Sequence, residues 1–336
     1  MRLGADHSER QAAPLAHHRG RLLDLHAPGG QSARQQRRAA SAHHEPVGST
    51  VEKGRPMSQL QVVSYSEVST ARQCLHKHHL AYQLRLRKPE RQGTASARGT
   101  LFHSMLELHY QRIAAGFQPE RAVYDLMDEW HHQGVTSFED DDLLQWMYEG
   151  YIKHWGYDRQ WRLVATEQRF ELQLPPATGT GNVYGIKGMI DLVVLDKGRH
   201  WVVDHKTGRR SPAEKQLDMS DQFVVYAWAL WQLGIEVEGC LHSWSNTQKN
   251  VHHEKQTLES RFKRTKMHRT QTEMLNAAQG LADSADLAWT TTHHPKSPSE
   301  DACKWCDYVD ACMLGRRGGD EIHFLTAAGF KPAGRN

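Results

Sequence analysis

Two acidic residues near the middle of the chain lie where a strand pattern would place apolar side chains. Asp191 follows Gly188-Met-Ile and precedes Leu-Val-Val-Leu, while Asp204 ends the run Trp201-Val-Val. A carboxylate removed from water is costly unless it is paired or bound to a cation. Carboxylates on adjacent antiparallel strands can converge on a Mg²⁺ ion that keeps several waters. The residue types therefore indicate metal-assisted hydrolysis of a phosphate ester.

Lys206 lies two residues beyond Asp204, and the period of two in a strand places both side chains on one face. A cation there can orient or help to deprotonate an attacking water, and can balance charge on the phosphate. An Asp-x-Lys pattern taken alone is more often an ordinary ion pair at a strand end, with Asp191 capping a turn. The hydrolytic interpretation therefore depends on other motifs that agree with it.

Four of the five cysteines form a second pattern. Cys74 stands alone, Cys303, Cys306 and Cys312 follow much later as CxxCxxxxxC, and Cys240 falls within an apolar strand pattern. Two thiolates at CxxC spacing can hold one tetrahedral ion or one edge of a cluster. Four thiolates satisfy either zinc or a cubane iron–sulfur cluster, and the spacing alone does not choose between them.

The elements that must position these residues change in type along the chain. Apolar positions at helical spacing predict helices near 67–84, 99–115, 119–133 and 139–158. Alternation predicts strands over 164–174, 183–195 and 200–204, with a Gly-rich break at 178–181 and a tight hairpin at Lys197-Gly198. An apolar helix over 218–233, a strand over 235–246 and a polar, partly basic helix over 258–284 complete the prediction.

Composition separates the first 56 residues from the rest. They hold nine basic residues (Lys and Arg) and five acidic residues (Asp and Glu). Residues 57–336 therefore hold 33 basic and 34 acidic residues, so the excess of positive charge lies in the first 56 residues. They contain no Phe, Trp, Tyr, Ile or Cys, so we expect a disordered basic tail over 1–56. The tail is either a nucleic-acid-binding arm or, as we favour, sequence upstream of a true start at Met57. We expect one domain over 57–316 and a C-terminal tail over 317–336.

Other classes of protein are disfavoured by the totals. No apolar run approaches the roughly 20 residues that span a bilayer. Five cysteines in 336 residues, without a signal-like N-terminal stretch, argue against a disulfide-stapled secreted scaffold. We expect a cytoplasmic protein with no membrane partner. The net charge of +3 is weak support for any partner, because a nucleic-acid footprint is a local patch.

The segments Gly188 to Asp191 and Val202 to Gly208 resemble the PD-(D/E)XK nuclease superfamily, within it the RecB-like or AddB-like iron–sulfur exonuclease branch, which is often phage or prophage encoded. The likeness covers about Ser64 to Cys312 and rests on five motifs in order. The proline that names the superfamily is absent, since Ile190 precedes Asp191, but the RecB-like branch commonly lacks it.

The resemblance implies roles for particular residues. Gly99-Thr-Leu-Phe-His103-Ser-Met-Leu-Glu107 fits the helical histidine motif of the family. The implied ligands of Mg²⁺ or Mn²⁺ are His103, Asp191, Asp204 and the backbone carbonyl of His205, with Lys206 positioning the water. Glu167 stands where relatives carry an acidic residue, which implies a supporting role at the metal.

Gln222-Phe-Val-Val-Tyr226 matches the Gln-x-x-x-Tyr element of the same family. The spacing of four places both side chains on one helical face, where they could contact the DNA backbone or the surroundings of Lys206. The resemblance also favours a four-iron four-sulfur cluster over zinc at Cys74, Cys303, Cys306 and Cys312. Such a cluster would close a loop of more than two hundred residues and restrict the unfolded chain.

The implied fold is α/β and restriction-endonuclease-like, with a central mixed sheet flanked by helices and its ends joined by the cluster. The implied activity is exonucleolytic hydrolysis of DNA ends, single or double stranded, in recombination, repair or phage DNA metabolism, with a helicase or recombinase as a partner. No GxxxxGK(S/T) motif is present, so any unwinding must come from a partner. Two alternatives stay open: a non-catalytic DNA-binding subunit of a helicase–nuclease, and a CRISPR adaptation nuclease.

If DNA is the substrate, local basic groups must contact it, because residues 57–336 carry almost no net charge. Each candidate group could equally be a solvated surface. The candidates are Arg85, Arg87, Lys88, Arg91 and Arg98; Arg209 and Arg210; and Arg261, Lys263, Arg264, Lys266 and Arg269.

Overall fold

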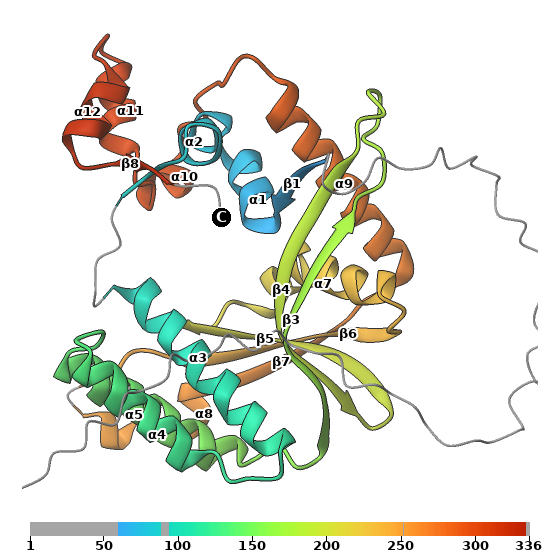
Figure 1. The fold of residues 1–336 in the computed structure, drawn as a ribbon, viewed down its shortest axis with the longest axis vertical. Coiled ribbons are helices and arrows are strands. Elements are labelled where there is room, and N and C mark those ends of the chain that lie inside the picture. The colour runs from blue at the N-terminus through green and yellow to red at the C-terminus, as the bar shows by residue number, and fades with distance from the viewer. Residues whose placement is uncertain (1–59, 89–93, 251, 334–336) are drawn as a thin grey trace, which may run out of the picture.

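The computed structural model describes residues 60–88, 94–250 and 252–333, so the expected basic tail and the start at Met57 lie outside the described residues. No helix in these ranges has both the length and the apolar character needed to cross a bilayer. A six-stranded mixed sheet forms the centre (Figure 1). Its strands are β1 (Gln61–Ser64), β3 (Trp161–Gln173), β4 (Tyr184–Asp196), β5 (Arg199–Gly208), β6 (Val237–Asn246) and β7 (Phe262–His268).

Strand β4 is the central strand of this sheet, because it pairs with three other strands. Strand β3 pairs with it antiparallel over most of its length. On the other edge, β1 pairs parallel with residues 184–187 and β5 pairs antiparallel with residues 192–196. Residues 188–191 pair with neither strand on that edge, so the sheet opens there. Beyond β5, β6 is parallel to β5 and β7 is antiparallel to β6.

Helices cover both faces of the sheet, which confirms the expected α/β architecture with a mixed sheet flanked by helices (Figure 1). Along β5, Val202 belongs to the core under α7 and α9, whereas Val203 belongs to the core under α3. Alternation along a strand explains this division. The helices concerned are α1 (Tyr65–Gln73), α3 (Ala95–Ala114), α4 (Glu120–His132), α5 (Phe138–Trp155), α6 (Glu214–Asp218), α7 (Asp221–Gln232) and α9 (Gln271–Thr290).

Several predicted elements are confirmed. Helices α3, α4, α5 and α7 and strands β3, β4, β5 and β6 lie within a few residues of their expected bounds. The hairpin between β4 and β5 has two residues with positive φ, Lys197 at 52° and Gly198 at 80°. Two consecutive positive φ values are what a tight two-residue hairpin requires. The helix expected over 67–84 is interrupted at Cys74, whose extended backbone ends α1 and precedes α2 (Leu75–His78) and the π-helix η3 (His79–Gln83).

The prediction of one basic helix over 258–284 is wrong. The segment holds a short helix α8 (Leu258–Arg261), then strand β7, and only then α9. Strand β7 pairs with β6 from Gly239 to Ser245, and it buries Phe262 and Met267. Lys, Arg and Met favour helices in isolation, but the open edge of β6 supplies long-range pairing that local periodicity does not reveal.

The two ends of the described chain pack against each other. Helices α10 (Glu300–Lys304), α11 (Val309–Gly315) and α12 (Glu321–Ala327) lie near α2 (Figure 1). Leu80 and Leu86 share a small apolar core with Tyr308, Leu325 and Phe330. Strand β2 (Leu86–Arg87) pairs with β8 (Lys331–Pro332), and the Tyr308 hydroxyl donates to the carbonyl of Leu86 at 2.6 Å. The segment expected as a C-terminal tail therefore includes α12 and β8.

A buried histidine makes the fold sensitive to acid. His109 on α3 is 0% exposed; its Nδ1 lies 3.0 Å from the Tyr148 hydroxyl, and its Nε2 has no hydrogen-bond partner among the described residues. Burial lowers the pKa of His109 to about 4, although the charges of Asp158 and Glu120 oppose the shift. In the unfolded chain the pKa returns to about 6.5. Between these values the unfolded state binds more protons, so the free energy of unfolding falls as the pH falls.

We expect His109 alone to lower the free energy of unfolding by up to about 3 kcal/mol between pH 6.5 and pH 4. Urea denaturation at a series of pH values measures this slope. His109→Gln, which cannot protonate, should show a shallower slope over the same window, whatever its stability at neutral pH. Equal slopes in the two proteins would contradict the assignment.

Candidate active site

The opening in the edge of β4 brings two carboxylates together. The ladder between β4 and β5 ends at the pair Leu192 and Val203. One further step in the same register sets Asp191 opposite Asp204. Side chains directly opposite each other on neighbouring strands lie close together. The site therefore forms where β5 separates from β4.

Asp191 connects three elements through one oxygen atom. Its Oδ2 accepts the backbone N–H of His205 at 2.7 Å and lies 3.4 Å from Nδ1 of His103 on α3. Burial by itself raises the pKa of this carboxyl, but the hydrogen bond and charge of His103, with the charges of His205 and Lys206, outweigh burial and lower it. Asp191 is thereby held as a carboxylate at neutral pH.

Asp204 and Lys206 form a close ion pair on the next strand. Asp204 is 1% exposed, and Nζ of Lys206 lies 2.7 Å from each of its oxygens. The contact with Oδ1 is a hydrogen bond, whereas the buried Oδ2 lies at ion-pair distance from the same Nζ but outside hydrogen-bond geometry. Burial raises the pKa of Asp204, Lys206 opposes this effect and Asp191 adds to it. A further cation beside Oδ2 would relieve this cost.

His103 reaches the site because α3 approaches the end of β5 closely. A Cβ atom on Gly99 would lie 3.0 Å from Oγ1 of Thr207, so any larger residue would make a tight contact there and require a small shift. Gly99 and His103 are one turn apart on the same helical face. Burial lowers the pKa of His103, but its hydrogen bond to Asp191 and the charge of Asp191 raise it overall. The Gly-x-x-x-His spacing therefore combines a close contact with a donor to Asp191.

Glu167 lies in the interior of β3 and faces the same site. It falls between the pairs Thr166 to Leu192 and Gln168 to Ile190, opposite Asp191. Its φ of 47° is left-handed, a conformation that costs on the order of 1–3 kcal/mol and recurs at functional sites. Burial, with the charges of Asp191 and Glu107, raises its pKa to about 7.

Glu107 is a member of this acidic group to which the sequence analysis gave no role. It lies one turn after His103 on α3, and burial raises its pKa. Its helical spacing from His103 was the signal that could have identified it.

Gln222 and Tyr226 lie on one face of α7, where Nε2 of Gln222 donates to the Tyr226 hydroxyl at 2.9 Å. The Tyr226 ring packs edge to face on Phe170, with 6.2 Å between centroids. Burial raises the pKa of Tyr226, and the negative charge of Asp204 raises it further. The pair therefore lies beside the carboxylates, with the Tyr226 hydroxyl remaining protonated.

A divalent cation fits the chemistry of these donors. Carboxylate oxygens and water are the ligands that Mg²⁺ prefers, and Asp204 Oδ2 is buried without a hydrogen bond. Within residues 60–88, 94–250 and 252–333, no three His, Cys, Asp or Glu side chains already converge closely enough to hold one ion. The donor residues therefore lie around the opening of the sheet, and their side chains would have to move closer together to bind one ion.

The four patterned cysteines lie together at the junction of the two ends of the chain. Cys74, Cys303, Cys306 and Cys312 line one cavity of about 70 Å³, whereas Cys240 is buried in the sheet core. Burial raises the pKa of the Cys306 and Cys312 thiols. Beside the cavity, Glu321 on α12 pairs with His76 and Lys296. Among the described residues, these cysteines do not form a group already close enough to hold one metal ion.

Several residues named as candidate DNA contacts have other partners. Arg264 pairs with Asp158 and its side chain is 8% exposed. Arg261 and Arg269 are 8% and 6% exposed, and Arg269 pairs with Asp218. The interpretation of these arginines as a DNA-binding surface is therefore wrong, because all three side chains are almost fully buried: Arg264 on β7, Arg261 at the end of α8 and Arg269 directly after β7.

Other basic candidates remain on the surface. Arg98 pairs with Asp140 at 2.5 Å, but Arg209 and Arg210, directly after β5, are exposed. Their place at the end of the strand that carries Lys206 keeps them available to a phosphate backbone. Arg91 lies outside the described residues.

Gly188, three residues before Asp191, allows Phe170 to pack across β4. A Cβ atom on Gly188 would lie 2.5 Å from Cζ of the buried Phe170 ring. We expect Gly188→Ala to lower the free energy of unfolding by about 1–3 kcal/mol through overpacking, measured by urea denaturation. Gly208→Ala, whose Cβ would have ordinary contacts beginning at 3.6 Å, is the matched control. Recovery of stability in Gly188→Ala with Phe170→Leu would identify the ring as the cause, and a fully stable single variant would contradict it.

Comparisons with known proteins agree with the motifs. The family model described as the PD-(D/E)XK nuclease superfamily matches residues 62–313, which is three quarters of the chain. No curated protein matches the sequence.

Two solved structures show remote similarity. One, described as "Crystal structure of SSO0001", has a TM-score of 0.29 and 16% identity over 69% of this chain and 91% of that one. Another, described as a "Putative exonuclease" from Eubacterium rectale, has a TM-score of 0.43 and 10% identity over 74% of this chain and 87% of that one. The family match alone carries the assignment. From the span of that match, the chain belongs to the PD-(D/E)XK nuclease superfamily.

Proposed function

We propose that this member of the superfamily is a Mg²⁺- or Mn²⁺-dependent DNA exonuclease of the RecB-like, AddB-like branch, acting on DNA ends in recombination, repair or phage DNA metabolism. The observation that carries the proposal is the arrangement at the opening of β4. There Asp191 is tied to β5 and to His103, while Asp204 holds Lys206 at 2.7 Å. These are donor types that a divalent cation requires, in a chain that belongs to a family of nucleases.

In this proposal the acidic residues hold the ion. The proposed ligands are Asp191, Asp204, His103 and the backbone carbonyl of His205, with Glu167 in support. A bound divalent ion supplies Lewis-acid stabilisation of the phosphate and lowers the pKa of a bound water. Repulsion between Asp191 and Asp204 favours binding of a cation, because it raises the cost of leaving both carboxylates ionised and without one.

Lys206 has the second proposed role. Its Nζ is anchored to Asp204, yet its side chain is 40% exposed, so it can contact both the site and a substrate. We assign to it the orientation of the attacking water and the balance of charge on the phosphate. Gln222 and Tyr226 would donate to the DNA backbone or hold the surroundings of Lys206.

The buried carboxylates support catalysis over the alternative of a non-catalytic DNA-binding subunit. Asp204 is almost fully buried, and Glu167 has a strained backbone and a pKa of about 7. A scaffold gains nothing from desolvated acidic groups and strain, both of which lower stability. These costs are typical of sites that bind a cation and perform chemistry.

We also propose that Cys74, Cys303, Cys306 and Cys312 hold a four-iron four-sulfur cluster. Support comes from the convergence of four thiols from both ends of the chain on one cavity. Four thiolates can hold either a cubane cluster or a zinc ion, and the preference for the cluster comes from the resemblance of the cysteine spacing to iron–sulfur nucleases. The cluster would supply a covalent link between the chain ends, while the small core around Tyr308 supplies apolar contacts.

We expect Asp204→Asn and Lys206→Met to lower DNA cleavage by about 10²–10³-fold or more, because each removes a group that stabilises the transition state. The assay uses Mg²⁺ or Mn²⁺ and DNA labelled separately at each end, which distinguishes an exonuclease from an endonuclease. Lys266→Met is the matched control, since Lys266, although one of the basic candidates, pairs with Asp196 at 2.6 Å at the end of β4 far from the opening. Full cleavage by the folded Asp204→Asn variant would refute the assignment.

For the cluster, we expect protein purified without oxygen to be brown, with broad visible absorption and iron in excess of zinc. Cys312→Ser should lose the colour and most of the iron. Cys240→Ala is the matched control and should keep both, because Cys240 is buried in the sheet core and its thiol donates to the Phe223 carbonyl. A colourless wild-type protein that contains one zinc ion would overturn this proposal without affecting the nuclease assignment.

A further inference from the structure

The imidazole of His205 is an unexplained feature of the catalytic strand. Its backbone N–H holds Asp191 at 2.7 Å, but its ring occupies the opposite side of β5 from Asp204 and Lys206. His205 is 4% exposed, and neither ring nitrogen has a hydrogen-bond partner among the described residues. Polar bonds therefore do not fix the orientation of the ring, so packing must do so.

Two tyrosines provide that packing. The ring of Tyr110 on α3 stacks on His205, with 5.8 Å between centroids and 19° between planes. Tyr151 on α5 contacts the same imidazole edge to face at 6.2 Å. Both tyrosines are 1% exposed or less, and their hydroxyls lie 2.7 Å apart. The ring of His103 also lies edge to face against the imidazole, with 6.3 Å between centroids. The position of the imidazole thus depends on these two tyrosines together with His103.

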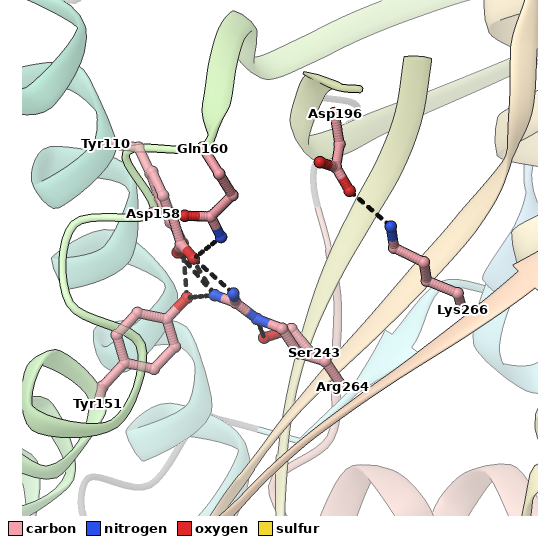
Figure 2. A network of polar contacts seen from close by, with 8 residues as sticks. All are labelled: Tyr110, Tyr151, Asp158, Gln160, Asp196, Ser243, Arg264 and Lys266. Carbon is pink, nitrogen blue, oxygen red and sulfur yellow. Dashed lines mark hydrogen bonds and ion pairs between the residues drawn. The ribbon is translucent and has the colours of Figure 1, made fainter. Parts of the chain in front are cut away.

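A buried ion pair holds the two tyrosines, as Figure 2 shows. Arg264 binds both oxygens of Asp158, at 2.6 and 2.8 Å, and donates to the Tyr151 hydroxyl at 2.9 Å. The Tyr110 hydroxyl donates to Asp158 at 2.7 Å. Bidentate pairs of this kind have a fixed geometry and are stronger than neutral hydrogen bonds. The network therefore fixes the distance from α3 and α5 to the sheet.

The position of Arg264 follows from strand register. His205 on β5 pairs with Ser243 on β6, and Ser243 pairs with Arg264 on β7. The three residues form one row across the sheet. The guanidinium also lies over the rings of Trp155 and Trp161, at 4.0 and 4.3 Å from their centroids. Arg264 is thus immobilised on the same face as the His205 ring, two strands away.

We propose that Arg264 and Asp158 are positioning residues for the reaction. Through Tyr110 and Tyr151 they fix the ring of His205, and with it the backbone N–H that orients Asp191. The catalytic consequence rests on the proposed metal-dependent cleavage, but the effect on the His205 backbone does not. Neither residue of the ion pair touches the reacting groups.

The molecule contains a matched control for this proposal. Lys266, two residues after Arg264 on β7, pairs with Asp196 at the far end of β4 at 2.6 Å (Figure 2). Asp196 is 7% exposed, and the described contacts of this pair include no tyrosine at His205. Loss of the Asp196 charge should therefore destabilise the protein without moving the His205 backbone.

The first test is hydrogen exchange of the His205 amide in the full chain without added Mg²⁺ or Mn²⁺, resolved by mass spectrometry with fragmentation. We expect Asp158→Asn to exchange on the order of tenfold faster than wild type and Asp196→Asn to match wild type. Loss of one partner of a buried pair can prevent folding. Tyr151→Phe, which keeps the ring and removes the hydroxyl bonds, is therefore measured in parallel and should also exchange faster.

The second test is the Mn²⁺ concentration that gives half-maximal binding, measured by calorimetry, and half-maximal cleavage. We expect both to rise by about tenfold or more in Asp158→Asn and Tyr151→Phe, as for other residues that support metal ligands, and to stay unchanged in Asp196→Asn. The proposal would be overturned if Asp158→Asn and Tyr151→Phe had lower melting temperatures than wild type but the same rate of His205 amide exchange and the same dependence on Mn²⁺. If wild type cleaves no DNA, the proposed function fails, whereas faster exchange would still support the positioning role.

Discussion

The hydrogen bond from the His205 backbone to the Asp191 carboxylate is the contact on which the rest of the site depends. It replaces strand pairing at the point where β5 leaves β4, so the sheet can open without losing the alignment of its two strands. Because the acceptor is a side chain, the same atom that joins the strands also meets His103. A structural bond and a candidate metal ligand are thus one group, and the geometry of one fixes the other.

Because successive side chains along β5 point to opposite faces of the sheet, the two faces carry different kinds of contact. Asp204 and Lys206 present an ion pair to the candidate site, while the intervening His205 packs into the tyrosine layer on the other side. The first face carries buried carboxylates that Lys206 neutralises only in part, and a further cation can stabilise them. The second face carries a buried pair in which Arg264 and Asp158 satisfy each other. One strand therefore connects the candidate site on one face to a rigid network on the other, as preorganised sites require.

The junction of the two chain ends depends on other contacts for its stability. The apolar core around Tyr308 is small, and a few buried side chains contribute only modest stability. Four cysteines converge beside this core from both ends of the chain, and the Glu321 ion pairs close the same region. A bound group at these cysteines would restrict the unfolded chain, which apolar packing on this scale achieves weakly.

The α/β class, most helix and strand positions, the tight hairpin at Lys197-Gly198 and the family could all be predicted from the sequence, because they follow from periodicity, turn chemistry and motif spacing. That residues 262–268 form a strand could not be predicted, since the edge of β6 supplies their partners. The same pairing turned Arg264 from an apparent surface charge into a buried one. The left-handed Glu167 and the contact of Asp191 with His205 were also beyond the sequence. Such features arise from contacts between residues far apart in the chain, which local patterns do not encode.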